Sequence, residues 1–436
     1  MNIKILLYDA IEHGELKGIE ERNKLLVEMT DEVAALVLRD NYEQTQAISI
    51  THSPGESVLD TQARFMRALE RAAKLDRALE GLPDDETIAE RHAGRIGLTR
   101  PEIAVLMAYS KISLYQDLLG SNLPDDPLLL QDLLLYFPHE LRKAFPAAIG
   151  RHRLRREIIA TYVTNNALNR LPPTFIWQMT EEMGRSSSDV ARAFTIIRDA
   201  FDLRSLWSEI ESLDNRLPAA QQIDMFISVS RLLERAIRWL LRSDYDKLDI
   251  AAYVSEFRPR ITALEQRLGD ILPPAVMTAL QGREGRLIEM GTPQQLAHRI
   301  AALDVMSSAM DIVRISRVAE QQGIEEVARV YFGVGARFGL ERLRAAGSSI
   351  AAETPWQKAA VSAIVDDLFN YQSVLASRVI AEANGARDPV DAWLARRARV
   401  VERIDQTMNE VRSAPSVDLA MLTVASRQLR TLVESS

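Results

Sequence analysis

The chain has 436 residues, 47% of them hydrophobic and only 6% aromatic, which is enough for two or three domains or one elongated helical array. Its net charge of −8 opposes general attraction to a nucleic-acid backbone or an anionic membrane, so neither is an expected partner. The sequence contains no cysteine, which excludes disulfides and thiolate chemistry and is compatible with a cytoplasmic location.

The residue patterns predict an all-α fold, a multi-helix array or bundle in two or three helical subdomains with little or no β-structure. Nineteen glycines and seventeen prolines are few for this length, which argues against a turn-rich β-fold. The first apolar run ends at Asp9, and no apolar run reaches the roughly 18 residues of a membrane span. We therefore expect neither a signal peptide nor a membrane helix.

The N-terminal part, residues 1–90, is expected to form the first domain. Residues 2–8 suit either a short strand or the first turns of a helix. A helix is predicted from Thr30, as its N-cap, to about Ile50, followed by a second over residues 56–80. These two helices are expected to pair as an antiparallel hairpin.

The strongest helix signal lies in residues 97–121. Thr99 and Glu102 have the T-x-x-E spacing of a capping box, and Pro101 occupies the first turn, where a missing N–H costs nothing. The apolar stripe consists of Ile103, Leu106, Met107, Ile112, Leu114 and Leu118. Start signal, periodicity and the stop at Gly120 agree on one amphipathic helix.

Further helices are predicted over the rest of the chain. The clearest covers residues 221–242 and carries a bundle-like seam with one polar residue at Ser230. Charge concentrates in residues 243–249, which predicts a boundary between domains of residues 91–244 and 245–436. The seam is formed by Ile223, Phe226, Leu233, Ile237 and Leu240. The other helices are expected at about residues 126–136, 153–171, 189–201, 250–269, 274–281, 293–321, 324–331, 337–346, 355–383, 389–412 and 417–434, with a second capping box at Thr354 and Gln357.

Several sequence words occur in a fixed order along the chain. They are NIKILL from Asn2, MTDEVAALVLRDNY from Met29, GLTRPEIAVLMAYSKI from Gly97, LPDDP from Leu123, YFP from Tyr136, HRLRREIIAT from His152, FDLRSLWSEIESLD from Phe201 and RWLLR from Arg238. In this order the words resemble the C-terminal region of the large bacterial NAD-specific glutamate dehydrogenases. The resemblance spans nearly the whole chain and is strongest over residues 91–242.

The resemblance implies a helical segment of an enzyme that converts L-glutamate, NAD and water to 2-oxoglutarate, ammonium and NADH. In that family the nucleotide-binding and catalytic parts precede the NIKILL word. The resemblance therefore assigns no catalytic, cofactor-binding or metal-binding residue to this chain, and it implies that NAD binds upstream. It also implies that residues 1–90 join the catalytic domain, that the chain braces that domain, and that it contributes contacts in a homo-oligomer.

One glycine-rich stretch invites comparison with a phosphate-binding loop. Gly333, Gly335 and Gly339 read G-x-G-x-x-x-G, so the third glycine comes one residue late for the dinucleotide fingerprint. The fingerprint also needs a preceding strand, whereas residues 325–331 read as helix. A joint between two helices is the favoured interpretation.

Motifs for metal or nucleophilic chemistry are absent from the sequence. No G-x-S-x-G motif occurs, and no two histidines have the i, i+4 spacing of H-E-x-x-H. The histidines are His13, His52, His92, His139, His152 and His298.

A cluster of arginines precedes Glu157 and allows two interpretations. It could form an anion or nucleic-acid site near a helix start, or it could pair with acidic residues such as Asp125 and Asp126 on neighbouring helices. The second is favoured because charged clusters are usually solvated or paired. The arginines are Arg151, Arg153, Arg155 and Arg156.

Asn165, Asn166 and Asn169 are unusual because asparagine is a poor helix former and needs partners when it is buried. They could line a ligand pocket with Arg170. The favoured alternative is a buried network that fixes helix packing.

Two pairs of neighbouring aspartates, Asp84-Asp85 and Asp125-Asp126, each follow a proline. Adjacent side chains point apart, so we interpret these pairs as helix N-caps rather than as a general acid and base.

The leading functional interpretation is the helical part of a glutamate dehydrogenase, lacking catalytic activity on its own. The alternatives are a stand-alone helical interaction scaffold and, more weakly, an anion- or nucleic-acid-binding module that uses the arginine cluster of residues 151–156.

Overall fold

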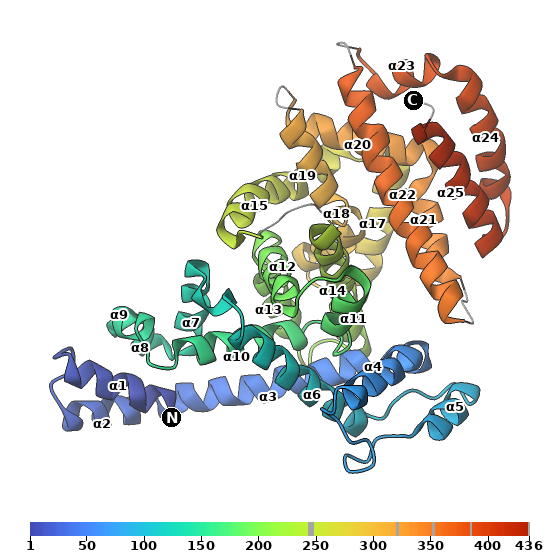
Figure 1. Cartoon of the computed structure of the whole chain (residues 1–436). Helices are drawn as coiled ribbons and strands as arrows, with labels where there is room; N and C mark the ends of the chain where they lie inside the picture. Colours follow the sequence, from blue (N-terminus) through green and yellow to red (C-terminus); the bar gives the residue numbers. More distant parts are fainter. Residues whose placement is uncertain (243–247, 320–321, 351–353, 384–385, 435–436) are drawn as a thin grey trace. The chain divides into compact units, whose positions relative to one another are not determined.

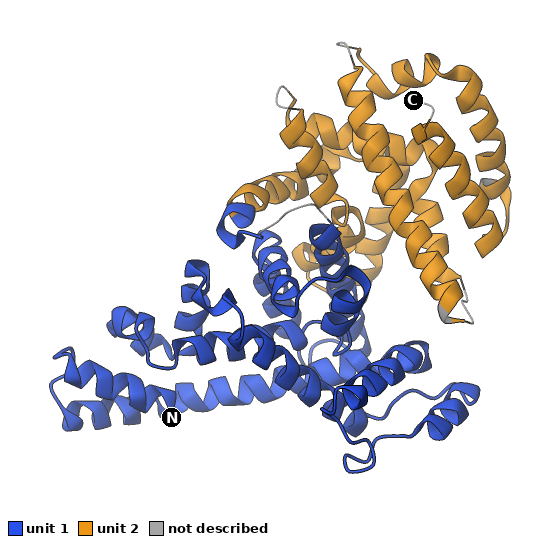
Figure 2. Cartoon of the chain, viewed as in Figure 1, with its two compact units in different colours: residues 1–254 blue, residues 255–436 orange. Residues whose placement is uncertain are grey.

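The computed structural model describes residues 1–242, 248–319, 322–350, 354–383 and 386–434. These residues form 25 α-helices and three short 3-10 helices, with no strand, which confirms the all-α prediction. The chain divides into two compact units, Met1–Val254 and Ser255–Ser436 (Figure 2). The sequence predicts a boundary at residues 243–249. Of these, residues 243–247 lie outside the described part.

The first unit contains the helices coloured from blue to green in Figure 1. They are α1 (Asn2–Glu12), α2 (Ile19–Glu28), α3 (Thr30–His52), η1 (Gly55–Val58), α4 (Leu59–Arg71), α5 (Asp85–Ala93), α6 (Arg100–Leu119), η2 (Leu123–Asp125), η3 (Pro127–Leu129), α7 (Leu130–Tyr136), α8 (His139–Ala144), α9 (Pro146–Gly150), α10 (Arg155–Leu168), α11 (Phe175–Met183), α12 (Ser187–Ala200), α13 (Leu203–Glu211) and α14 (Ala219–Arg242).

The division between the units falls inside α15 (Ile250–Gln266). The remaining helices of the second unit are α16 (Leu268–Ile271), α17 (Pro274–Glu289), α18 (Gln294–Met306), α19 (Ala309–Val318), α20 (Ile324–Phe338), α21 (Leu340–Ser349), α22 (Pro355–Ala381), α23 (Pro389–Ala395), α24 (Ala398–Ser413) and α25 (Leu419–Glu434).

The N-terminal helices agree with the prediction in part. Residues 2–8 belong to helix α1, so the helical alternative is the one found. The predicted N-cap role of Thr30 is wrong, because its hydroxyl donates to the Leu26 carbonyl at 2.9 Å and its own side chain caps nothing. The long helix α3 packs mainly against α6 and α14, and α4 packs against α5. The antiparallel hairpin predicted for residues 30–50 and 56–80 is therefore not the packing found.

Helix α4 ends nine residues earlier than residue 80, at Arg71. Ala73 adopts a left-handed conformation with φ +53°. The Lys74 N–H then donates to the Leu69 carbonyl, and the Ala73 N–H donates to the Glu70 carbonyl, both at 2.9 Å. This is the Schellman pattern that terminates many helices, usually with glycine at the left-handed position. Alanine gives no such signal in the sequence.

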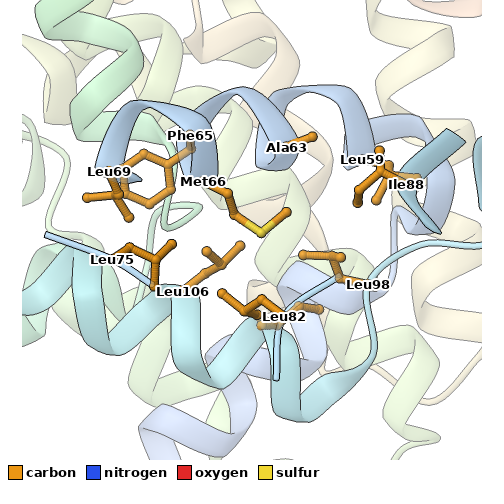
Figure 3. Packing of buried hydrophobic residues seen from close by; sticks show 11 residues of the cluster. Leu59, Ala63, Phe65, Met66, Leu69, Leu75, Leu82, Ile88, Leu98 and Leu106 are labelled. Carbon is orange, nitrogen blue, oxygen red and sulfur yellow. The ribbon is translucent and has the colours of Figure 1, made fainter. Parts of the chain in front are cut away.

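Helix α6 anchors one hydrophobic cluster of the first unit, shown in Figure 3. Its capping box is confirmed: the Thr99 N–H donates to Glu102 Oε2 at 2.7 Å. Leu106 and Ile103 are buried together with Met66 from α4. Ile112 is 52% exposed, so its predicted place in the apolar stripe is wrong.

The centre of the first unit is α12, which packs against α6, α10, α11, α13 and α14. On α14, Phe226, Leu233, Ile237 and Leu240 are buried as the seam predicts. Ile223 and Ser230 are only partly buried. The apolar face widens to include Met225, Val229, Leu232 and Ala236, so α14 is a core helix of a globular unit rather than a narrow seam.

In the second unit, α20 and α22 pack against each other, and α22 also packs against α21 and α25. The capping box of α22 is confirmed, since the Gln357 N–H donates to Thr354 Oγ1 at 3.2 Å. The helix predicted over residues 293–321 is instead two helices that meet at Ser307 and Ser308. Serine side chains compete for backbone carbonyls, and Ser307 Oγ donates to the Leu303 carbonyl at 3.0 Å. Residues 320–321 lie outside the described part.

Replacing Leu106 by alanine is expected to lower the free energy of unfolding by about 2–5 kcal/mol, because a fully buried leucine is removed and a cavity remains. Ile112→Ala on the same helix is the matched control and should change stability by less than about 0.5 kcal/mol. Urea unfolding of the two variants measures both values. Similar losses would contradict the packing described for α6.

Candidate functional site

The asparagines singled out in the sequence lie on α10 and just after its end. Asn169 is buried. Its Oδ1 accepts a hydrogen bond from Lys111 Nζ at 2.8 Å, and its Nδ2 donates to Glu43 Oε2 at 3.5 Å. Asn169 is therefore an internal packing partner, as the favoured interpretation predicts.

Arg170 is the centre of a buried polar network in the first unit. Its side chain is only 5% exposed. Nη2 donates to Glu211 on α13 at 2.5 Å, and Nη1 donates to Gln46 on α3 at 2.8 Å. The guanidinium also stacks on Trp207, 4.8 Å from the ring centre. One side chain thus joins the end of α10 to α3 and α13.

Lys111 on α6 is a second cation of this network. Burial lowers the pKa of Lys111 to about 8, although the nearby carboxylates of Asp40 and Glu43 favour the charged form. Partial burial, with a smaller contribution from Glu43, raises the pKa of the Asp40 carboxyl. The network therefore holds groups that titrate away from their ordinary ranges, which is one feature of functional sites.

Two cavities adjoin the network, and Arg170 and Trp207 line both of them. The first has a volume of about 340 Å³ and lies between the end of α3, the start of α4, residues 169–178 and α14. Its carboxylate is Glu234, whose pKa is raised by burial and whose Oε1 accepts from Ser230 at 3.0 Å.

The second cavity has a volume of about 530 Å³ and is bordered by residues 1–3, α3, α7, α8, α10 and α13. Asn165, Asn166 and Arg170 all line it. The structure therefore brings together the residues of the ligand-pocket interpretation. Asn169 instead lines the first cavity. Both sizes lie within the range of small-molecule sites.

A second group of buried charges lies between α7, α12 and α13. The fully buried Arg198 donates to Asp132 Oδ2 at 2.9 Å and to Asp199 Oδ1 at 2.7 Å. Arg204 also pairs with Asp132. Each carboxylate of this group thus pairs with at least one arginine. Such pairing is needed because a buried charge without a partner is strongly destabilising.

Three of the four arginines in the cluster of residues 151–156 pair with acidic side chains, so the favoured interpretation is confirmed for these three. Arg153 donates to Glu12 on α1 at 2.6 Å, Arg151 pairs with Glu15, and Arg156 pairs with Asp125. Arg155 donates to the Gly150 carbonyl at 3.4 Å. The cluster ties α1 to the start of α10.

The aspartate pairs divide between two structural roles. Asp84 caps α5 by accepting from the Thr87 N–H at 2.8 Å, and Asp126 caps η3 by accepting from the Leu128 N–H at 3.1 Å, so the capping prediction is confirmed for these two. Asp85 instead forms an ion pair with Arg77 at 2.9 Å, and Asp125 forms one with Arg156. For Asp85 and Asp125 the capping prediction is wrong.

The glycine-rich stretch does not form a phosphate-binding loop. Gly333 and Gly335 lie inside α20, and the joint between helices is at Gly339, with φ +66°. A Cβ atom on Gly335 would lie 2.5 Å from Nε2 of Gln372 on α22. This glycine therefore permits close packing of two helices and offers no free N–H groups to a dinucleotide.

No cluster of metal-ligating side chains occurs among the described residues. Two of the six histidines form short contacts with carboxylates: His92 with Glu56 at 2.7 Å and His298 with Glu284 at 3.1 Å. His152 contacts the Asn2 carbonyl at 3.1 Å. Such pairs are structural contacts rather than a ligand set.

Sequence reasoning missed the partners of Arg170 and the importance of Lys111. Glu211 lies 41 positions from Arg170, and Asn169 lies 58 positions from Lys111. No local spacing connects residues this far apart. Besides the asparagines, the i, i+4 pair of Arg39 and Glu43 on α3 is a local sign of the network.

Comparison with known proteins places the sequence of this chain in a family. Residues 95–431 match the family model of the glutamate dehydrogenase C-terminal region, and residues 1–51 match that of the bacterial NAD-glutamate dehydrogenase catalytic domain. The chain therefore belongs to the glutamate dehydrogenase C-terminal family. The second match extends to residue 51, so the expectation that catalytic-domain sequence ends before Asn2 is wrong.

Curated relatives align over the whole chain. NAD-specific glutamate dehydrogenases from Pseudomonas aeruginosa, Halomonas elongata and Mycobacterium tuberculosis are 39%, 34% and 31% identical to it. Each alignment covers 100% of this chain but only 27% of the relative. Among the described helices, none is both long and apolar enough to cross a membrane.

Replacing Arg170 by alanine is expected to lower the free energy of unfolding by about 3 kcal/mol, because the buried carboxylates of Glu211 and Glu43 lose their enclosed cation. Arg39→Ala is the matched control. Arg39 contacts the same two carboxylates but is 55% exposed, so its loss should cost about 1 kcal/mol or less. Urea unfolding measures both, and equal losses would contradict the central role of Arg170.

The lowered pKa of Lys111 predicts a pH dependence. Below about pH 8 both the folded and the unfolded protein carry the Lys111 proton. Between about 8 and the ordinary value of 10.5, the folded protein has released this proton while the unfolded protein still binds it, so this group makes stability rise with pH.

The stability of the wild type minus that of Lys111→Met should therefore increase across this window, by at most about 1.4 kcal/mol per pH unit. Urea unfolding of both proteins at several pH values provides the measurement. A difference that is constant with pH would show that Lys111 titrates normally.

Proposed function

We propose that this chain is the C-terminal helical part of an NAD-dependent glutamate dehydrogenase, which converts L-glutamate, NAD and water to 2-oxoglutarate, ammonium and NADH. Its role in this proposal is to brace the catalytic domain. The observation that carries the proposal is the uncovered surface of α2 and α3, which lie in the segment that matches the catalytic-domain family.

Helices α2 and α3 bury very little within the first unit. Helix α2 has no buried residue, and the 23-residue α3 has one, Ala47. Val37 and Leu38 are 55% and 68% exposed, and Val27 is exposed as well. Isolated helices are marginally stable in water and depend on tertiary packing. This apolar surface suits a large partner domain.

The occupant we propose for this surface is the rest of the catalytic domain. Residues 1–51 match part of that domain's family model, and the relatives are nearly four times as long as the aligned segment. Continuity with that domain argues for it over an unrelated partner. The domain division proposed from the sequence, residues 1–90, 91–244 and 245–436, has its first boundary close to residue 95, where the C-terminal family match begins.

NAD, in this proposal, binds to the catalytic domain rather than to the described residues of this chain. Gly335 of the glycine stretch permits close packing of α20 on α22, and Arg170 and Arg198 of the first unit are engaged in ion pairs that link helices. Homo-oligomer contacts and a cytoplasmic location belong to the same proposal. A stand-alone scaffold fits less well, because every residue of the chain aligns with enzymes of one specificity.

The test is a charge placed on the uncovered surface in the longer polypeptide. Leu38→Glu should lower glutamate-dependent NADH formation at least about tenfold, because an unpaired carboxylate buried at an interface costs more than about 1.4 kcal/mol. Leu79→Glu is the control. Leu79 is 82% exposed and lies outside both family matches, so activity should be retained.

The 436-residue chain alone should form no NADH from glutamate and NAD. Glutamate-dependent NADH formation by the chain alone would overturn the proposal. Full activity of the Leu38→Glu protein would show that α3 does not meet the catalytic domain.

A further inference from the structure

The larger cavity of the first unit, about 530 Å³ in volume, has a cationic lining. Four arginines line it, and two carboxylates, Asp40 and Glu43, accompany them. The arginines are Arg39, Arg142, Arg170 and Arg204. Their partners decide whether this charge is available to a ligand.

Three of the four arginines are already neutralised by protein carboxylates. Arg39 pairs with Glu43 at 2.9 Å, and Arg170 pairs with Glu211 at 2.5 Å. Arg204 pairs with Asp132. These ion pairs use the charge of each guanidinium to hold helices together.

Arg142, on α8, is the exception. It is half-buried, its Nε is enclosed without a hydrogen-bond acceptor, and its guanidinium forms no ion pair with any residue that the structure describes. Burying a cation without a counter-charge is costly. A guanidinium kept in this state on a cavity wall needs an anion to offset the cost.

The amides next to this cavity add hydrogen-bond donors. Asn165 lines the cavity, and its side chain makes no hydrogen bond within the described ranges. Asn166 uses its Nδ2 to donate to the Tyr162 carbonyl at 2.9 Å. Asn165 is therefore the amide that is free to contact a ligand, on the helix that the sequence singled out.

The two carboxylates of the lining are balanced by their own cations. Glu43 pairs with Arg39 and lies 3.7 Å from Arg170. Asp40 interacts electrostatically with Lys111 and Arg39. Among the charged side chains of the lining, the one left uncompensated is thus Arg142.

We propose that this cavity binds a small anion bearing a carboxylate or phosphate group, held by the Arg142 guanidinium and the Asn165 amide. A guanidinium presents parallel N–H donors that match both of these oxyanions. The inference rests on this cavity and not on the proposed enzymatic function.

The bound anion has a structural consequence. The cavity walls come from residues 1–3 and α3, which match the catalytic-domain family, and from α8, α10 and α13, which match the C-terminal family. A ligand that contacts both would stabilise their packing, so binding should raise the unfolding temperature.

The test uses the 436-residue wild-type chain, with inorganic phosphate and succinate as separate probes and sodium chloride at matched ionic strength as the reference. Isothermal titration calorimetry gives the Kd, and thermal unfolding gives the shift in Tm. Wild type should respond to at least one probe beyond the chloride reference. A response to phosphate alone identifies a phosphorylated ligand class, and a response to succinate identifies carboxylates.

Arg142→Gln should weaken binding of the responding probe at least about tenfold, and Asn165→Ala should weaken it several-fold. Arg71→Gln is the matched control, since it removes the same charge from an exposed arginine of α4 outside the cavity, and its Kd should equal that of the wild type. Without a probe, Arg142→Gln should unfold at a temperature no lower than the wild type, because it removes an uncompensated charge.

The proposal is overturned if wild type responds to neither probe, or if Arg142→Gln binds as tightly as wild type. Equal weakening by Arg71→Gln would also overturn it, because the response would then follow net charge rather than the cavity. Loss of glutamate dehydrogenase activity in the longer polypeptide plays no part in these readouts, so the two proposals fail separately.

Discussion

The ion pair between Arg170 and Glu211 is the interaction on which the interior of the first unit depends. It sits where the end of α10, α3 and α13 meet, with Trp207 stacked on the guanidinium. A charge this deeply enclosed is tolerated only when its partners hold fixed positions. The same contacts therefore determine how these helices approach one another, and Arg170 and Trp207 line both cavities.

The helices of the first unit differ greatly in how many side chains they bury. Helices α2 and α3 commit almost no side chains to the core, while α12 is surrounded by five helices. A helix gains most of its stability from the face it buries. The uncovered helices lie in the segment that matches the catalytic-domain family, and this is the surface that the proposed contact with the rest of that domain would use.

The sequence predicted features that depend on neighbouring residues and missed features that depend on residues far apart in the chain. Both capping boxes are formed because their hydrogen bonds span three residues. The end of α4 was missed because Ala73 takes a left-handed conformation that glycine usually signals. The pairs of Arg170 and Lys111 were missed because their partners come from distant helices. Asparagines at helical positions marked the region correctly, but the sequence could not distinguish Asn169, a packing partner, from Asn165, which lines the larger cavity.

The arginines that line the larger cavity have two different roles: three stabilise helix packing, and one is proposed to bind the ligand. Arg39, Arg170 and Arg204 each give their charge to a protein carboxylate, and these pairs stabilise helix packing. Replacing such a pair by apolar residues is often neutral for stability, so stability alone does not require so many charges here. A cavity wall built from paired arginines keeps its shape when a ligand arrives, because no protein ion pair has to break. The unpaired Arg142 can then contribute its whole charge to the ligand, which makes the surrounding network a pre-organised frame for the binding residue.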